Sequence, residues 1–229
     1  MNSLLFELHL FDLDDTLIQT RASYYAAQEY AVDQLFEKLM LPGASEAYLE
    51  IKWFSKQIGS IDPPTYMAAF LKNRGLDLED NLTYLIQCYR ESYWGEMKLY
   101  PGARSYLQQL KGQGKKLGIV SNGTTSTQQK KIKTTELDQF FGDDTWFISG
   151  DFDRLHKKPH PFMLEKALSH FQVHRDATIY YGNTQDDVLA ANLAGITSLW
   201  FGPDRPNPQA PSLAQPKFQL SSWLEPLPF

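Results

Sequence analysis

An acidic cluster directly follows the first apolar run of the chain, residues 4–11. Carboxylates at the end of a buried strand cost free energy unless a cation or hydrogen-bond donors offset their charge. Residues two apart along a strand point the same way, so Asp12 and Asp14 are expected to share one side. Thr16 is expected roughly in line with them, and Asp15 is expected to point away. Two converging carboxylates are what a divalent cation and a phosphoryl group would need.

Three later segments also place polar side chains where a predicted strand ends and a helix begins. Each feature alone is explained by turn or cap chemistry. Together they favour a functional site, because ligands of open parallel sheets bind beyond the carboxyl ends of the strands. The segments are Ser121-Asn122 after residues 117–120, Lys157-Lys158-Pro159 after residues 146–148, and Gly182-Asn183-Thr184-Gln185-Asp186-Asp187 after residues 178–181.

The elements that must carry these residues alternate between short apolar runs and helical stretches, which predicts an α/β fold with a Rossmann-like, doubly wound parallel sheet. Residues 19–97 interrupt the alternation with helical periodicity alone. We therefore predict a core domain over residues 1–17 and 98–229 and an all-helical domain over residues 18–97. The predicted strands are residues 4–11, 117–120, 146–148, 178–181 and 197–201; the predicted core helices lie near 102–113, 160–171 and 185–194; and residues 218–224 return to pack after a proline-rich tail.

Composition narrows the function classes. The net charge of −5 leaves no basic excess to neutralise a nucleic-acid backbone, and the basic stretches at 111–116 and 130–133 are interpreted as solvated helix faces. The N-terminal apolar run stops at acidic residues after about eight residues, which is too short for a membrane span or a signal peptide. The single cysteine, Cys88, excludes an internal disulfide. A soluble cytoplasmic protein without nucleic-acid or membrane partners is expected.

These segments resemble the four motifs of the haloacid dehalogenase superfamily, in the branch with an all-helical cap inserted after the first strand. The resemblance covers about residues 4–201, and the helical domain over residues 18–97 matches the cap in placement and helicity. It implies a phosphatase. The matching residues are Asp12, Asp14 and Thr16 in motif one, Ser121 in motif two, Lys158 in motif three, and residues 182–187 in motif four.

The resemblance implies a catalytic role for four residues. Asp12 would attack phosphorus and become an aspartyl-phosphate. Asp14 would protonate the leaving oxygen and then activate water as a general base. Ser121 would bind phosphoryl oxygens, and Lys158 would act as a compact positive charge between Asp12 and the phosphate. The implied phosphate-binding set is Thr16, Ser121, Asn122 and Lys158.

The resemblance also implies a bound Mg²⁺, held by Asp12, Asp14, Asn183 and Asp187. One of these positions departs from the family pattern, because motif four begins with Gly-Asp in most members and here reads Gly-Asn. An amide oxygen can coordinate Mg²⁺ but brings no negative charge. Weaker metal binding than in relatives is expected, unless Asp187 or Asp186 moves in to compensate.

The implied substrate is a small phosphorylated metabolite, a nucleotide monophosphate or a sugar phosphate. Specificity is expected to come from the cap, near Arg21, Tyr24 or Trp53. The protein is expected to be a monomer or a homodimer.

Other activities stay open at this point. Haloacid dehalogenase chemistry, in which Asp12 attacks carbon without a metal, is disfavoured by Asp14, since no leaving-group acid is needed there. Phosphonate hydrolysis needs a cap lysine that the sequence does not single out. A receiver domain of a signalling protein is disfavoured by motif order and by the inserted helical domain. A catalytically weakened relative that binds a partner is favoured by Asn183 alone.

Overall fold

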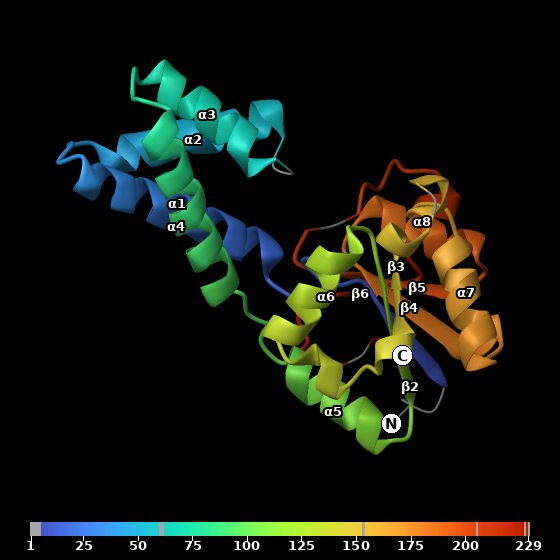
Figure 1. The fold of residues 1–229 in the computed structure, drawn as a ribbon. Helices are drawn as coiled ribbons and strands as arrows, with labels where there is room; N and C mark the ends of the chain where they lie inside the picture. Colours follow the sequence, from blue (N-terminus) through green and yellow to red (C-terminus); the bar gives the residue numbers. More distant parts are fainter. Residues whose placement is uncertain (1–5, 60–61, 153, 205, 227, 229) are drawn as a thin grey trace. The chain divides into compact units, whose positions relative to one another are not determined.

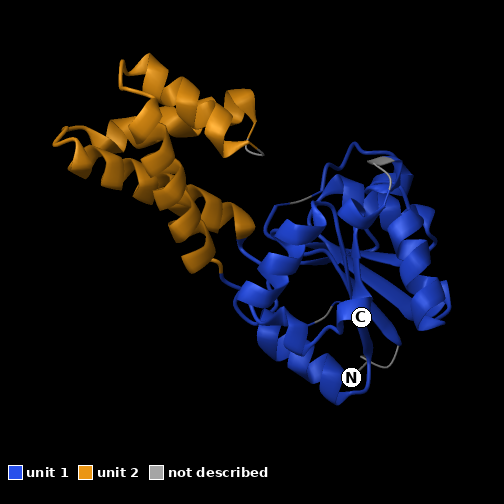
Figure 2. Ribbon diagram, in the orientation of Figure 1, with its two compact units in different colours: residues 1–19, 98–229 blue, residues 20–97 orange. Residues whose placement is uncertain are grey.

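The computed structural model describes residues 6–59, 62–152, 154–204, 206–226 and 228. The chain divides into two compact units (Figure 2), which we call the core unit, residues 1–19 with 98–229, and the helical unit, residues 20–97. Among the described helices, none has both the length and the apolar character that crossing a membrane requires.

The described part of the core unit contains one sheet of six parallel strands in the order β3-β2-β1-β4-β5-β6 (Figure 1). Strands covered on both faces are mostly apolar, and β1 and β4 are buried along their whole length, including the polar residues His9 and Thr178. The predicted doubly wound parallel sheet is confirmed, and β6 adds an edge strand that the sequence pattern indicated only as a packing segment. The strands are β1 (Leu8–Phe11), β2 (Lys116–Ser121), β3 (Trp146–Ile148), β4 (Thr178–Gly182), β5 (Thr197–Phe201) and β6 (Phe218–Leu220).

The register of the three central strands brings their carboxyl ends level. Phe11, the last residue of β1, pairs with Ile119 of β2 and with Tyr181 of β4. The next residue, Asp12, donates its backbone N–H to the Tyr181 carbonyl at 2.8 Å. The residues that follow these strands therefore meet at one edge, where the strand order reverses beside β1.

Helices cover both faces of the sheet, with α7 and α8 on one side and α5 and α6 on the other (Figure 1). The alternation of side chains along β1 fits this arrangement. Leu8 and Leu10 join a buried cluster with α7 and α8, whereas Phe11 lies against Tyr106 of α5. The helices are α5 (Ala103–Gly112), α6 (Thr125–Thr134), α7 (Phe162–Phe171) and α8 (Gln185–Leu193).

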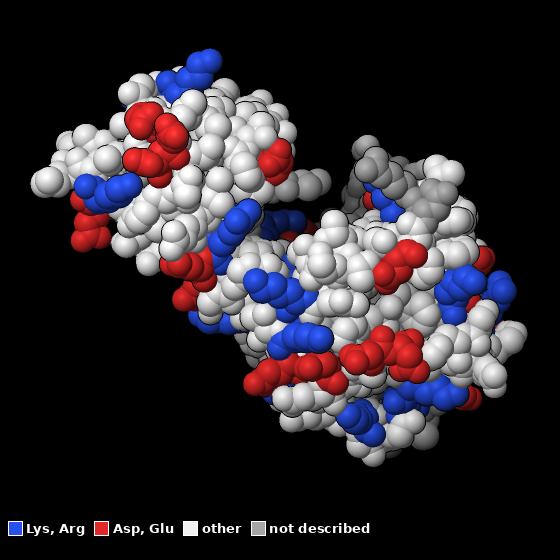
Figure 3. Space-filling model, in the orientation of Figure 1, with Lys and Arg blue, Asp and Glu red and all other residues white. Residues whose placement is uncertain are grey.

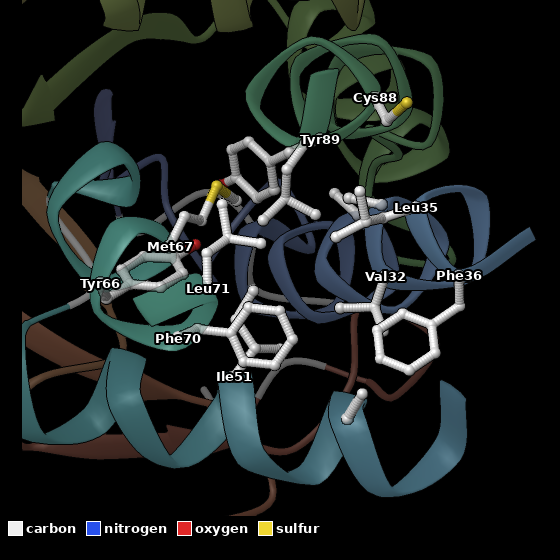
Figure 4. Packing of buried hydrophobic residues seen from close by; sticks show 14 residues of the cluster. Val32, Leu35, Phe36, Ile51, Tyr66, Met67, Phe70, Leu71, Cys88 and Tyr89 are labelled. Atoms are coloured by element: carbon white, nitrogen blue, oxygen red, sulfur yellow. The ribbon is translucent and has the colours of Figure 1, made fainter. Parts of the chain in front are cut away.

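The helical unit has its own apolar core (Figure 4), formed by one face of each of its helices. Chain reversal between the first two helices uses Gly43, whose φ of 86° is a left-handed conformation that suits glycine. Cys88 lies at the margin of this core. The helices are α1 (Thr20–Lys38), α2 (Ala44–Ile58), α3 (Pro63–Asn73) and α4 (Glu79–Gly95).

An aromatic layer ties the C-terminal segment to the loop after β1. The ring of Trp223 stacks on Phe201 and Tyr106, and its Nε1–H donates to the Thr16 carbonyl at 3.0 Å. Gly102 makes this approach possible, because a Cβ there would lie 3.0 Å from the Trp223 backbone and its φ is 85°. The C-terminal segment thus supports the acidic loop.

Buried His9 couples the stability of the core unit to pH. Its side chain is fully buried, and its Nδ1 lies 2.9 Å from the Tyr181 hydroxyl. Burial, aided by the Lys115 ammonium, lowers the pKa of His9 from 6.5 to about 3. The folded pKa is the lower one, so the stabilisation is complete above the unfolded pKa and is lost as pH falls toward the folded pKa.

We expect this histidine to lower the free energy of unfolding by about 2 kcal/mol when pH is reduced from about 7.5 to about 5. The variant His9→Gln lacks the titrating group, so its loss of stability between the two pH values should be smaller by that amount. Urea unfolding of both proteins at both pH values measures the difference. An equal pH dependence in the two proteins would contradict the expectation.

Candidate active site

The loop after β1 turns sharply, which corrects the expected arrangement of its side chains. The chain leaves the extended conformation at Asp15, whose φ is 57°, and the backbone N–H of Leu17 donates to the Leu13 carbonyl. Thr16 therefore does not continue a strand face. Its hydroxyl reaches back one turn and donates to Asp12 Oδ2 at 3.2 Å. Thr16 thus contacts the predicted nucleophile, but through a turn rather than through strand alternation.

Lys158 lies at the centre of the site, and its side chain is only 4% exposed. Its ammonium donates to Asp12 Oδ1 and to Asp187 Oδ1, both at 2.6 Å. The same Nζ lies 2.8 Å from the Tyr180 hydroxyl and 3.1 Å from the Val120 carbonyl, which share its third N–H. A buried ammonium needs such partners, since desolvation without them would neutralise it. The predicted contact of Lys158 with Asp12 is present.

The side chain of Asn122 holds the segment that carries Lys158. Its Nδ2 donates to the Lys158 carbonyl at 2.9 Å, and its Oδ1 accepts from the Lys158 backbone N–H at 2.9 Å. These paired hydrogen bonds join the end of β2 to a segment far along the chain. Asn122 is thus placed as a support for Lys158, and its predicted contact with a phosphoryl group stays a prediction.

The buried charges shift one another's protonation. Burial raises the pKa of Asp12 to about 7, although the Lys158 ammonium opposes the rise. For Lys158, burial acts to lower the pKa, but the two carboxylates outweigh it and raise the pKa above its ordinary value. For Asp187, burial acts to raise the pKa, and Lys158 outweighs it and lowers the pKa. At neutral pH the site therefore holds a charged lysine, an ionised Asp187 and an Asp12 that titrates.

The Asp187 carboxylate connects the motif-four segment to Lys158 through hydrogen bonds. Its Oδ1 accepts from Lys158 and from the Tyr180 hydroxyl, the latter at 2.9 Å. Its Oδ2 accepts from the Thr184 hydroxyl at 2.6 Å and from the Asn183 and Thr184 backbone N–H groups, in a capping box that begins α8. Both oxygens are thus engaged in holding Lys158 and the helix start. This placement favours a structural role for Asp187 over the predicted metal-ligand role.

The side chain of Asn183 provides the structural evidence for a metal site. Its Oδ1 is buried and has no hydrogen-bond partner among the described residues. A buried acceptor without a partner is costly, and an amide oxygen is a ligand that Mg²⁺ accepts. No group of three or more His, Cys, Asp and Glu side chains in the described part of the chain could hold a metal. A cation site at this edge can therefore use this amide oxygen together with the nearby carboxylates, and the residues present fit a Mg²⁺ ion.

Two side chains of α6 complete the surroundings of Asp14. The Lys131 ammonium donates to Asp14 Oδ1 at 2.6 Å, and Gln128 Nε2 donates to Asp14 Oδ2 at 2.8 Å. Gln128 Nε2 also donates to Ser121 Oγ at 2.8 Å. The predicted acid/base residue and the predicted phosphate-binding hydroxyl are thus linked by one amide group.

The sequence pattern missed both of these residues. The interpretation of residues 130–133 as a solvated helix face is wrong for Lys131, which is 6% exposed, while Lys130 and Lys133 on the same helix are exposed. A usable signal was the spacing Gln128-x-x-Lys131, which puts a polar pair on one face of a helix that starts beside Ser121.

The residues considered for specificity lie in the helical unit. Tyr24 packs edge-on against Tyr66 and Tyr89, which places it in the core of that unit. Trp53 on α2 is 55% exposed, and Arg21 is exposed in the first turn of α1. Figure 3 shows basic and acidic side chains interspersed on the visible face of each unit, without a continuous basic patch in that view.

Comparisons with known proteins agree with this geometry. The chain is 33% identical over 195 residues to a glyceraldehyde 3-phosphate phosphatase of Pyrococcus furiosus, covering 83% of this chain and 78% of the relative. It is 28% identical over 190 residues to the pyrophosphatase PpaX of Bacillus mycoides, covering 83% and 80%. A structure of YfnB from Bacillus subtilis bound to magnesium superposes with a TM-score of 0.66 at 26% identity, covering 95% of both chains.

The family assignment rests on most of the chain. The model of the haloacid dehalogenase-like hydrolase family matches residues 9–201, which run from β1 to the end of β5 and include every residue of the site. The strand order, the inserted helical unit and the lysine between two aspartates agree with the resemblance that the motifs indicated. This chain is a hydrolase that belongs to the haloacid dehalogenase-like family.

Proposed function

We propose that this protein is a Mg²⁺-dependent phosphatase that hydrolyses a small phosphomonoester through an aspartyl-phosphate on Asp12. The observation that carries the proposal is the buried Asp12 carboxylate, held by Lys158 at 2.6 Å at the carboxyl end of the central strand. The similar protein from Pyrococcus furiosus is named a glyceraldehyde 3-phosphate phosphatase, which supports a small phosphomonoester, and the one from Bacillus mycoides is named a pyrophosphatase, which supports a small phosphorylated substrate more broadly.

In the first step, an oxygen of Asp12 attacks phosphorus and forms an acyl-phosphate bond. The bond between phosphorus and the leaving oxygen breaks, its electron pair stays on that oxygen, and Asp14 supplies a proton to it. Lys158 fixes one oxygen of Asp12 and brings a positive charge next to the incoming phosphoryl oxygens. Ser121 Oγ lies at the same edge and can bind a phosphoryl oxygen.

In the second step, Asp14 acts in its ionised form. It takes a proton from water as the water oxygen attacks phosphorus, and the bond between phosphorus and the Asp12 oxygen breaks. This releases inorganic phosphate, restores the Asp12 carboxylate and leaves Asp14 protonated for the next cycle. One residue thus serves as acid and then as base, and the proton it gave in the first step is recovered in the second.

Asp12 and the Asn183 amide oxygen would hold the Mg²⁺ ion, near Asp14. When bound, the ion offsets the repulsion between the Asp12 carboxylate and the phosphoryl group. Asp187 is not included, because both of its oxygens accept hydrogen bonds from Lys158, Tyr180 and the start of α8. The predicted Asp14 side-chain ligand is left out as well, because its two oxygens accept from Lys131 and Gln128. The metal set that we propose is therefore smaller and less acidic than the family pattern implies.

A phosphate-release screen with and without Mg²⁺ tests the proposal. The panel combines 4-nitrophenyl phosphate with nucleotide monophosphates, sugar phosphates, glyceraldehyde 3-phosphate and pyrophosphate, and a 2-haloacid serves as the dehalogenation control. Mg²⁺-dependent release from one class of phosphomonoester is expected. A folded protein that releases phosphate from no substrate in any divalent metal would overturn the proposal in favour of a binding protein.

Replacing Asn183 with aspartate is expected to tighten the apparent Mg²⁺ affinity about tenfold, or about 1.4 kcal/mol, because it restores a negative ligand to the site. Titration of Mg²⁺ against activity, together with calorimetric Mg²⁺ binding, measures the change. The matched control is Asp186→Asn, which alters an exposed carboxylate three residues further along, in the first turn of α8, and should leave the affinity within about twofold. Equal or weaker affinity in Asn183→Asp would contradict the expectation, and a loss of affinity in the control would show that Asp186 compensates.

A further inference from the structure

The strongest feature that the proposed function leaves unused is the contact from α6 to Asp14. Lys131 and Gln128 belong to one helix face, and each donates to a different oxygen of the same carboxylate, at 2.6 and 2.8 Å. Both side chains are almost completely buried. They come from a segment more than a hundred residues away from Asp14 along the chain.

A buried lysine in this position is poorly explained by folding alone. Desolvation of the buried ammonium opposes the attraction within such a pair, so the pair by itself is weak evidence of stabilisation. The α6 face already has an apolar anchor in fully buried Ile132. The pair between Lys131 and Asp14, whose carboxylate remains 30% exposed, is therefore better explained by what it does to Asp14.

Two donors on two oxygens fix the plane of a carboxylate as well as its position. Lys131 holds Oδ1 and Gln128 holds Oδ2, so the two contacts together restrict rotation of the Asp14 carboxylate. Gln128 also contacts Ser121 Oγ, so the direction of Asp14 is set relative to a phosphate-binding hydroxyl. An ionised carboxylate has about four lone-pair sites, so two donors do not by themselves prevent it from carrying a proton.

We propose that Lys131, with Gln128, is a positioning residue that aims the Asp14 carboxyl group at the oxygen of the leaving group. The proposal rests on the proposed function, in which Asp14 gives its proton to that oxygen. It adds that proton transfer depends on a cation and an amide from α6, outside the four family motifs. Lys131 itself does not touch the reacting atoms in this role.

The proposal predicts that the decrease in rate caused by replacing Lys131 depends on the leaving group. An alkyl alkoxide is a strongly basic leaving group that needs a proton as the bond breaks, so misplacing Asp14 should slow its release. A 4-nitrophenolate ion is stable without a proton, so its release should be almost unaffected. The parameter kcat/KM reports only steps up to the first irreversible one, which excludes the later water attack that both substrates share.

The test compares kcat/KM for an alkyl phosphate and for 4-nitrophenyl phosphate in the native protein and in Lys131→Met. We expect the ratio of alkyl to aryl kcat/KM to fall about 10- to 100-fold, which is part of the usual contribution of general acid catalysis. The ratio is independent of the folded fraction, because both substrates are measured on one preparation. Lys131→Arg keeps a cation at the end of a similarly long stem and should recover most of the ratio.

Two further variants test whether the effect is specific to Lys131 and whether it acts through Asp14. Lys133→Met removes an exposed lysine of the same helix and should leave the ratio unchanged. In Asp14→Asn the ratio is already low, and adding Lys131→Met should lower it by less than about twofold, because the two act in one step. A ratio that does not change in Lys131→Met, or equal losses for both substrates, would overturn the proposal. A native protein that hydrolyses neither phosphate would instead overturn the proposed function.

Discussion

Replacing Asp12 with asparagine is expected to lower kcat/KM for 4-nitrophenyl phosphate at least about 1000-fold, which corresponds to about 4 kcal/mol of transition-state stabilisation. The amide has no charged oxygen to attack phosphorus, and it also weakens the pair with Lys158. Phosphate release under saturating Mg²⁺ measures the loss. Turnover within about tenfold of the native protein would exclude Asp12 as the nucleophile.

The matched control for this variant is Asp15→Asn, the same chemical change in the same loop. Asp15 has a left-handed backbone conformation, φ 57°, which asparagine adopts readily, so the fold should be kept. Its carboxylate is not part of the proposed chemistry. We expect kcat/KM of the control to stay within about threefold of the native value.

In Asp12→Asn, the effect on stability should differ from the effect on activity. The folded pKa of Asp12, about 7, is above its ordinary value of 3.8, so the stabilisation from this group is complete at low pH and is lost as pH rises through 7. Asparagine does not titrate and has no such loss. We therefore expect the variant to gain stability relative to the native protein between about pH 4 and pH 8. An inactive variant that is equally or more stable at the higher pH shows that function, rather than stability, requires the carboxylate.

Much of the fold could be predicted because parallel strands have a strong signal. Residues 117–120, 178–181 and 197–201 are short, apolar and separated by helical stretches, and each became part of a strand of the observed sheet. Residues 4 and 5 of the first predicted strand lie outside the described residues, and the observed strand begins two residues after Phe6 and covers Leu8–Phe11. The three-residue β6 was predicted only as a packing segment, because so short an edge strand has no periodicity of its own.

The convergence of Asp12, Ser121 and Lys158 could also be predicted, since it follows from the shared carboxyl edge of parallel strands. The sequence pattern could not show which role each residue has at that edge. Whether Asp187 binds a metal or holds Lys158 depends on distances set by the start of α8. Its spacing of three residues from Thr184 was a capping-box signal that pointed toward the second role.

Lys131 shows a second kind of limit. A run of lysines on a helix is usually solvated, and three-dimensional packing decides which member turns inward. Here α6 begins a few residues after Ser121, so the face that holds Gln128 and Lys131 lies against the acidic loop and buries one lysine while its neighbours stay exposed. The spacing from Gln128 puts Lys131 on a shared helix face, but only the position of α6 against that loop shows that this face is the buried one.

Replacing Lys158 with methionine is expected to reduce the free energy of unfolding by about 3–5 kcal/mol, because Asp12 and Asp187 are left as buried carboxylates without their common cation. Activity should fall with it, since the phosphoryl group also loses its nearest positive charge. Urea unfolding near neutral pH and phosphate release measure the two effects. A variant as stable as the native protein would show that the three-charge cluster does not stabilise the core unit.

The double variant Lys158→Met/Asp187→Asn separates stability from catalysis. It removes one of the two buried carboxylate charges that lost their cation, and the introduced amide oxygen can still accept hydrogen bonds at the start of α8. About half of the lost stability should therefore return. Activity should not return, because the charge beside Asp12 is still missing. Without Lys158, burial raises the pKa of the remaining carboxylates, so the single variant should gain stability as pH falls and lose it as pH rises. Recovery of activity in the double variant would contradict a catalytic role for Lys158 and would reduce it to a counter-ion for Asp187.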